Sequence, residues 1–132
     1  MTLNKLYAIA DKNKISVFHY PAYPLKAISI PSSIGIDADA IQTRAEEKEV
    51  LAHELGHQMR DAFYTIETSL ETKQRMEERA TRWAVLTLIS ATELKQAFQE
   101  GCTEIYQLAE RFDVSCEFMA EAIRIHKLKG NI

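Results

Sequence analysis

The stretch that decides the fold is Glu49-Val50-Leu51-Ala52-His53-Glu54-Leu55-Gly56-His57. It contains the pattern H-E-x-x-H, with two histidines four positions apart. Side chains at that spacing lie on one face of a helix, so His53 and His57 can bind one metal ion together. Glu54 lies about 100° further round the helix, where its carboxylate can reach a metal-bound water without ligating the metal. The spacing therefore predicts a helix that carries a zinc hydrolase site.

A structural interpretation of the same pattern is two hydrogen-bonded histidines on a buried helix face, with Glu54 in solvent. The flanking residues favour the metal site. Val50, Leu51, Ala52 and Leu55 surround the motif with apolar side chains, so the imidazoles should be substantially buried and need polar partners. Gly56 costs a helix about 1 kcal/mol relative to alanine, and such a residue tends to mark a place where something approaches closely.

Length and composition predict one ordinary domain spanning residues 1–132. A chain of this size can bury a core without disulfide or metal cross-links. Its hydrophobic content is 46%, its charged content is 27% and its formal net charge is -3. Acidic and basic residues are mixed along the chain, so no region has the positive charge expected of a phosphate-backbone binder. We therefore expect no nucleic-acid partner.

The two cysteines, Cys102 and Cys116, do not form a C-x-x-C pair, so we interpret both as small apolar residues. The chain opens Met1-Thr2-Leu3-Asn4-Lys5 with no basic and then apolar leader, which predicts a cytoplasmic protein. The longest apolar runs, such as 83–89, are far shorter than a membrane span, so no membrane partner is expected. The oligomeric state is left open.

The residues before the motif predict one short helix, over 2–12, and a small sheet of about three strands. The strand candidates are 15–20, 27–30 and 34–37, which are rich in β-branched and aromatic residues. The sequence after Asp39 is expected to be mostly helical. Capping-box signatures begin at Thr43 and Thr68, and the expected helices cover 44–60, 68–89, 92–100, 103–111 and 115–129. The fold class is α+β, with strands first and a helical bundle after them.

A catalytic zinc site needs a third protein ligand. In the helix expected over 68–89, Met76, Ala80, Trp83, Ala84 and Thr87 form one stripe that should pack on the motif helix. Glu77 lies near the edge of this stripe, whereas Glu78 points further towards solvent. We therefore favour Glu77 as the third ligand and keep Glu78 as the alternative. The structural alternative for Glu77 is a surface carboxylate paired with a basic residue one turn away.

The order of several short motifs resembles the ImmA/IrrE family of zinc metallopeptidases, most closely the short forms encoded beside repressors in prophages and mobile elements. The motifs are AISI, IGID, TRAE, LAHELGH, AFY, ERATRWA and TEIYQLAERFDV, and the likeness extends from about Ala27 to Ile125. LAHELGH followed by E-x-x-A-x-x-W-A is far more specific than H-E-x-x-H alone.

The resemblance implies a zincin-like fold in which His53, His57 and Glu77 bind zinc and Glu54 is the general base. It also implies an endopeptidase that cleaves a helix-turn-helix transcriptional repressor carried by the same mobile element. One position departs from the family pattern, because Thr81 replaces the usual Asp or Asn. If that position orients a ligand, the departure would weaken metal affinity or activity.

A peptidase also needs a hydrogen-bond donor for the oxyanion. Tyr64, seven residues after His57, is the favoured candidate, since a phenol donates without bringing a charge; a half-buried core tyrosine is the alternative. His19 and Arg75 are weaker candidates. The predicted strands could offer an edge to which an extended substrate adds as one more strand.

Two other function classes are compatible with the sequence. Residues 103–115 resemble the first helix and turn of a helix-turn-helix, and Ser115 would start a recognition helix. Glu117 and Glu121 would then face DNA, which disfavours that function. The other class is a catalytically silent domain that keeps the metal and binds a protein partner.

Overall fold

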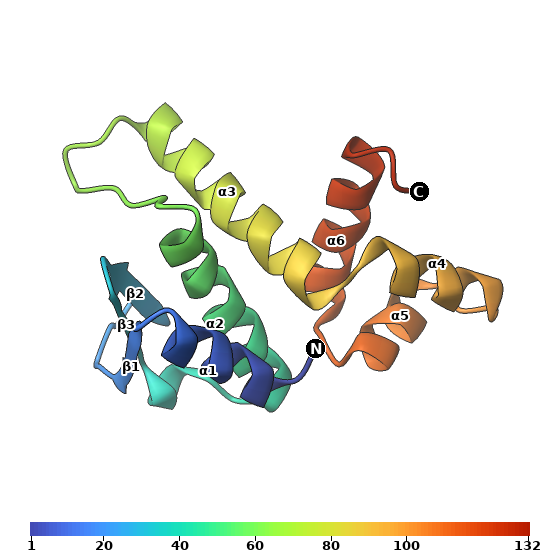
Figure 1. The fold of residues 1–132 in the computed structure, drawn as a ribbon, viewed down its shortest axis with the longest axis horizontal. Coiled ribbons are helices and arrows are strands. Elements are labelled where there is room, and N and C mark those ends of the chain that lie inside the picture. The colour runs from blue at the N-terminus through green and yellow to red at the C-terminus, as the bar shows by residue number, and fades with distance from the viewer.

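The computed structural model describes residues 1–132 and contains the predicted sheet and helices in the predicted order (Figure 1). An α+β fold results, with the sheet near the N-terminus. The helices are α1 (Leu3–Lys12), α2 (Arg44–Met59), α3 (Leu70–Leu88), α4 (Ala91–Gln99), α5 (Ile105–Phe112) and α6 (Cys116–Leu128), with a 3-10 turn η1 (Ala38–Ala40). The strands are β1 (Ser16–His19), β2 (Ala27–Ile30) and β3 (Ser33–Ile36).

The sheet has the order β1-β3-β2, so the last strand in sequence lies in the middle. β3 pairs in parallel with β1 and antiparallel with β2. This arrangement leaves β2 as an edge strand beside α2 (Figure 1). The middle strand is the most buried of the three because its inward face packs into the core, where Ile34 is fully buried.

The motif helix α2 begins at the predicted cap. The Thr43 hydroxyl accepts a hydrogen bond from the Glu46 N–H at 3.1 Å. The Glu46 carboxylate, however, accepts from the Gln42 N–H rather than from Thr43, so only one half of the predicted capping box forms. The cap of α3 differs from the prediction by one residue: Ser69 caps this helix, while the Thr68 hydroxyl accepts from the Thr65 N–H in the preceding loop.

Helices α2 and α3 cross closely, and the crossing is centred on Gly56 and Ala80. A Cβ atom added at Gly56 would lie 2.4 Å from the carbonyl oxygen of Ala80 and 2.8 Å from its Cα. The close approach that the glycine predicted is thus the packing of α3 against α2. The predicted stripe is partly correct: Ala80 and Ala84 are buried, but Val85 and Leu88 complete the buried face instead of Met76, Trp83 and Thr87, which are half-buried.

The hairpin formed by β2 and β3 is also held by α2. The Gln58 side-chain amide donates to the carbonyl oxygens of Ile30 and Ser33, and its oxygen accepts from the Ser32 N–H. Gln58 therefore binds the whole turn between β2 and β3. This contact fixes the position of β2 along the motif helix.

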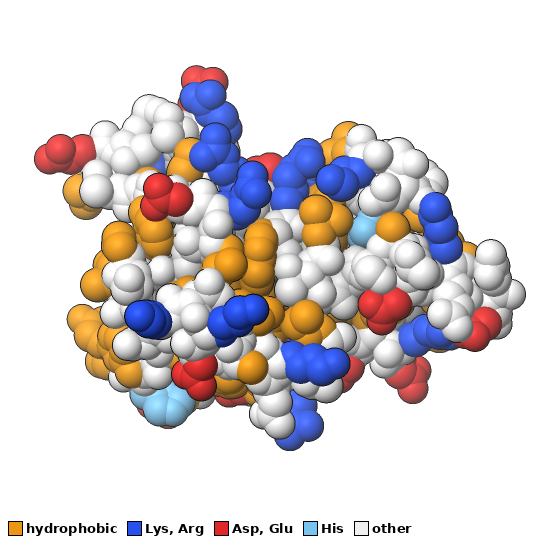
Figure 2. All heavy atoms as spheres, viewed as in Figure 1, with side chains coloured by type: hydrophobic (Ala, Val, Ile, Leu, Met, Phe, Trp, Pro, Cys, Tyr) orange, Lys and Arg blue, Asp and Glu red, His pale blue; other side chains and the backbone are white.

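The surface differs between the two ends of the molecule. Hydrophobic side chains gather over the sheet end, where Phe18, Tyr20, Tyr23, Leu25 and Ile30 are exposed (Figure 2). At the other end, α6 packs against α3 and α5 packs against α6, while α4 lies beyond the end of α3 (Figure 1). Each of the six helices is too short or too polar to span a lipid bilayer.

Candidate metal centre

The α2–α3 crossing brings together the three predicted ligands, His53, His57 and Glu77. His53 and His57 lie one turn apart on α2, and their ring centroids are 4.9 Å apart. Glu77 projects from α3, so that its carboxylate lies 2.7 Å from Nε2 of His53 and 3.4 Å from Nε2 of His57. Ligand atoms of the three residues all lie within 4.8 Å of one another. One ion can contact all three at once.

The second nitrogen of each ring has a partner that fixes the ring. Nδ1 of His57 lies 2.6 Å from the carbonyl oxygen of Ala62, so Nδ1 carries a proton, and Nε2 offers its lone pair to a metal whenever the ring is neutral. Nδ1 of His53 lies 3.4 Å from the Thr81 hydroxyl, which is a longer and weaker contact. Both Nε2 atoms face Glu77. This arrangement is the one that a metal requires of histidine ligands.

Two neutral imidazoles and a carboxylate fit zinc by their chemistry, because zinc accepts nitrogen and oxygen ligands and leaves a fourth position open in catalytic sites. The exposure of the three candidate ligands also fits a zinc site with an open fourth position. The His57 side chain is only 8% exposed, whereas those of His53 and Glu77 are 29% and 42% exposed. The site is thus anchored on a buried ring and open on the side where a substrate could approach.

The electrostatics of the site favour an ionised Glu77 and a protonated Tyr64. Hydrogen bonds from His53 and His57 hold the pKa of Glu77 far below its ordinary value, so Glu77 is ionised at neutral pH. Burial opposes the charged form of His57, but hydrogen bonds to Glu77 and Ala62 outweigh it and raise the pKa of that ring. The hydrogen bond to Glu77 raises the pKa of Tyr64 to about 12, so its hydroxyl stays protonated.

Tyr64 lies in the loop between α2 and α3. Its hydroxyl donates to Glu77 at 2.5 Å, and its ring lies 6.3 Å from that of His57. The tyrosine side chain is therefore adjacent to the ligand cluster, and 40% of the residue is exposed. The two weaker candidates lie elsewhere: His19 is exposed at the end of β1, and exposed Arg75 pairs with Glu71.

Glu78, the alternative third ligand, points away from the histidines. Its carboxylate accepts from Arg124 of α6 at 3.1 Å and also pairs with Arg82. It therefore joins α3 to the last helix. Of the two candidate third ligands, only Glu77 therefore lies beside both histidines.

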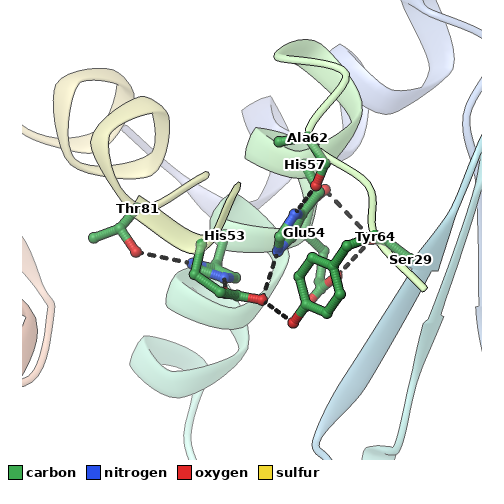
Figure 3. Close-up of polar contacts among 8 residues, drawn as sticks. Ser29, His53, Glu54, His57, Ala62, Tyr64 and Thr81 are labelled. Carbon is green, nitrogen blue, oxygen red and sulfur yellow. Dashed lines mark hydrogen bonds and ion pairs between the residues drawn. The ribbon is translucent and has the colours of Figure 1, made fainter. Parts of the chain in front are cut away.

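Glu54 is buried, and its carboxylate contacts β2. The hydroxyl of Ser29 donates to Oε2 of Glu54 at 2.5 Å (Figure 3). Glu54 and Ser29 line a cleft of about 350 Å³ that extends from β2 to the ligand cluster. The other lining residues are Leu25, Ala27, Ile28, His57, Ala62, Phe63, Tyr64 and Glu77.

Two groups at the site were not among the predicted residues: the Ser29 hydroxyl and the Ala62 carbonyl oxygen. A serine between the isoleucines of AISI was a signal for Ser29, because strand alternation places it on the same face as Ala27. The Ala62 contact gave no sequence signal, since any residue provides a backbone carbonyl. It depends on the turn after α2, where the Ala62 N–H also donates to the His57 carbonyl oxygen.

A family model described as the IrrE N-terminal-like domain, Peptidase_M78, matches residues 8–124. The chain belongs to this family. The resemblance drawn from the sequence motifs is thereby confirmed, and membership indicates a metallopeptidase. No curated protein and no solved structure matches the chain.

Proposed function

We propose that the protein is a zinc-dependent endopeptidase that acts in the cytoplasm on a helix-turn-helix repressor encoded nearby on a prophage or mobile element. The observation that carries the proposal is the cluster of His53, His57 and Glu77 beside the buried carboxylate of Glu54, in one cleft. Membership in a peptidase family supports the reaction class. The choice of substrate rests on the resemblance to the short prophage forms.

The chain supplies each group that peptide hydrolysis needs. Zinc held by the two imidazoles and Glu77 would polarise the peptide carbonyl and lower the pKa of a water molecule. Glu54 accepts the proton from the attacking water and delivers it to the leaving amine. The Tyr64 hydroxyl, protonated and next to the ligands, donates a hydrogen bond to the developing oxyanion.

The substrate segment would bind in an extended conformation along β2. This strand is at the edge of the sheet, and three of its residues line the cleft: Ala27, Ile28 and Ser29. Addition of a strand to an exposed edge satisfies the main chain of both partners and depends little on side chains. Apolar lining residues such as Leu25 and Phe63 favour an apolar segment.

A metal-dependence experiment tests the proposal. The purified protein, loaded with zinc or treated with a chelator, is mixed with the repressor encoded next to it. We expect cleavage only in the zinc-loaded sample, and we expect Glu54→Gln to bind zinc normally without cleaving. If Glu54→Gln cleaved at the wild-type rate, the mechanism would be wrong. If neither sample cleaved while the protein still bound the repressor, the silent metal-binding domain would replace the peptidase.

One contact disfavours the DNA-binding alternative. Glu49 of α2 accepts hydrogen bonds from the backbone N–H and the hydroxyl of Ser115, at the start of α6. The end of α6 that would enter the major groove is therefore packed against the motif helix. Tight, sequence-specific and salt-sensitive binding in a gel-shift assay would contradict this interpretation.

A further inference from the structure

The backbone of β2 offers two residues to the open edge of the sheet. The N–H of Asp37 donates to the carbonyl oxygen of Lys26 at 2.8 Å, so these residues form a hydrogen-bonded pair of the antiparallel ladder. Such pairs alternate with non-hydrogen-bonded pairs along the strands. The register therefore turns the backbone of Ile28 towards β3 and the backbones of Ala27 and Ser29 away from it.

Ser29 is thus linked to both parts of the reaction. Its backbone N–H and carbonyl point to the free edge, where a substrate strand would pair. Its hydroxyl lies 2.5 Å from Oε2 of Glu54 and 3.5 Å from the Glu54 carbonyl oxygen. In Figure 3, dashed lines join Ser29 to Glu54. No other side chain donates a hydrogen bond to the Glu54 carboxylate.

We infer that Ser29 is a positioning residue that couples the docking of an extended substrate on β2 to the orientation of Glu54. This inference rests on the proposed peptidase function. A carboxylate with one hydrogen-bond donor is held in one rotamer, and small displacements of a reacting group lower the rate strongly. A substrate paired with the Ser29 backbone fixes the strand from which that donor projects. Substrate binding and general-base alignment therefore depend on the same residue through different atoms.

The test uses the zinc-loaded protein and a synthetic peptide that spans the cleavage site mapped in the repressor. Ser29→Ala keeps the backbone and removes the donor, so kcat should fall about 10-fold to 100-fold while KM stays unchanged. Ser29→Thr keeps a hydroxyl on a strand-forming residue and should restore kcat, whereas Ser29→Cys should not. Ser33→Ala, in the neighbouring strand, is the matched control and should cleave like the wild type.

Two further measurements separate positioning from a general structural role. Zinc affinity and thermal stability of Ser29→Ala should equal those of the wild type. The affinity of inactive Glu54→Gln for peptides N-methylated at single positions should fall at alternate residues, because only alternate residues pair with an edge strand.

The outcomes distinguish the two proposals. A wild-type kcat in Ser29→Ala would overturn the positioning role and leave the proposed peptidase function intact. A rate loss accompanied by weaker zinc binding would also overturn the positioning role. Uniform effects of N-methylation along the peptide would overturn docking on β2. Absence of cleavage by the zinc-loaded wild type would instead refute the proposed function itself, and the inference with it.

Discussion

Replacing Gly56 by alanine should lower both the stability and the metal affinity of this protein. In an isolated helix the change would be favourable by about 1 kcal/mol. Here the added methyl group would lie 2.4 Å from the Ala80 carbonyl oxygen, well inside van der Waals contact. The obstructing atoms belong to the backbone of α3, so no side-chain rotation relieves the overlap, and the two helices must separate.

Overpacking of this kind costs about 3 kcal/mol at the upper end of its usual range. After the gain in helix propensity, a net loss of about 2 kcal/mol remains. With an unfolding entropy of about 0.28 kcal/mol per kelvin for a chain of this length, the midpoint of thermal unfolding should fall by about 7 °C. Separation of α2 from α3 also moves Glu77 away from the imidazoles, so zinc affinity should fall about 10-fold or more.

Thermal unfolding followed by circular dichroism, with and without zinc, measures the first effect, and competition with a chromophoric chelator measures the second. The double variant with Ala80→Gly is the control: it removes only a side chain, so it should not restore Gly56→Ala. The reasoning would be refuted by an unchanged or raised midpoint together with wild-type zinc affinity. Rescue by Ala80→Gly would show that the overlap involves the side chain instead.

Three other predictions concern residues at or beside the metal ligands. Thr81→Asp should tighten zinc binding about 10-fold, because a carboxylate orients the His53 ring better than a hydroxyl at 3.4 Å. Thr81→Val should weaken zinc binding. Equal affinities in both variants would show that position 81 does not act on the metal. Tyr64→Phe should weaken zinc binding, because the phenol donates to Glu77, and at saturating zinc it should still lower kcat about 100-fold or more. A wild-type kcat at saturating zinc would limit Tyr64 to supporting Glu77. The raised pKa of His57 means that its proton stabilises the metal-free fold fully below pH 6.5 and no longer does so once the pH rises through the folded pKa. Zinc competes with that proton, so as the pH rises through the same window zinc affinity should rise and fewer protons should be released on binding. Calorimetry in buffers of different ionisation enthalpy measures both quantities.

Local signals in the sequence predicted most of the fold. Thr43 caps the motif helix at the predicted residue, and the helical periodicity of 70–88 placed Glu77 rather than Glu78 towards α2. These signals succeed because a cap and an amphipathic stripe are properties of neighbouring residues. The one-residue error at Thr68 has the same origin, since Ser69 is an equally good cap and only the loop geometry decides between them.

Contacts between distant segments could not be predicted in this way. Short strands do not specify their order, so neither the central position of β3 nor its parallel pairing with β1 followed from the sequence. The hydrogen bond from Ser29 to Glu54 joins residues 25 positions apart and depends on the packing of β2 beside α2. The contacts that support the candidate site residues therefore required the three-dimensional structure.

The attachment of the hairpin turn to Gln58 limits how this site can be transplanted. Three strands of four residues have little stability of their own, and here the turn between β2 and β3 is hydrogen-bonded to Gln58 of the motif helix. A protein engineer who grafted H-E-x-x-H alone onto another scaffold would lose the strand on which we propose that the substrate docks. The smallest portable unit therefore contains the hairpin, the motif helix up to Gln58 and the part of α3 that carries Glu77.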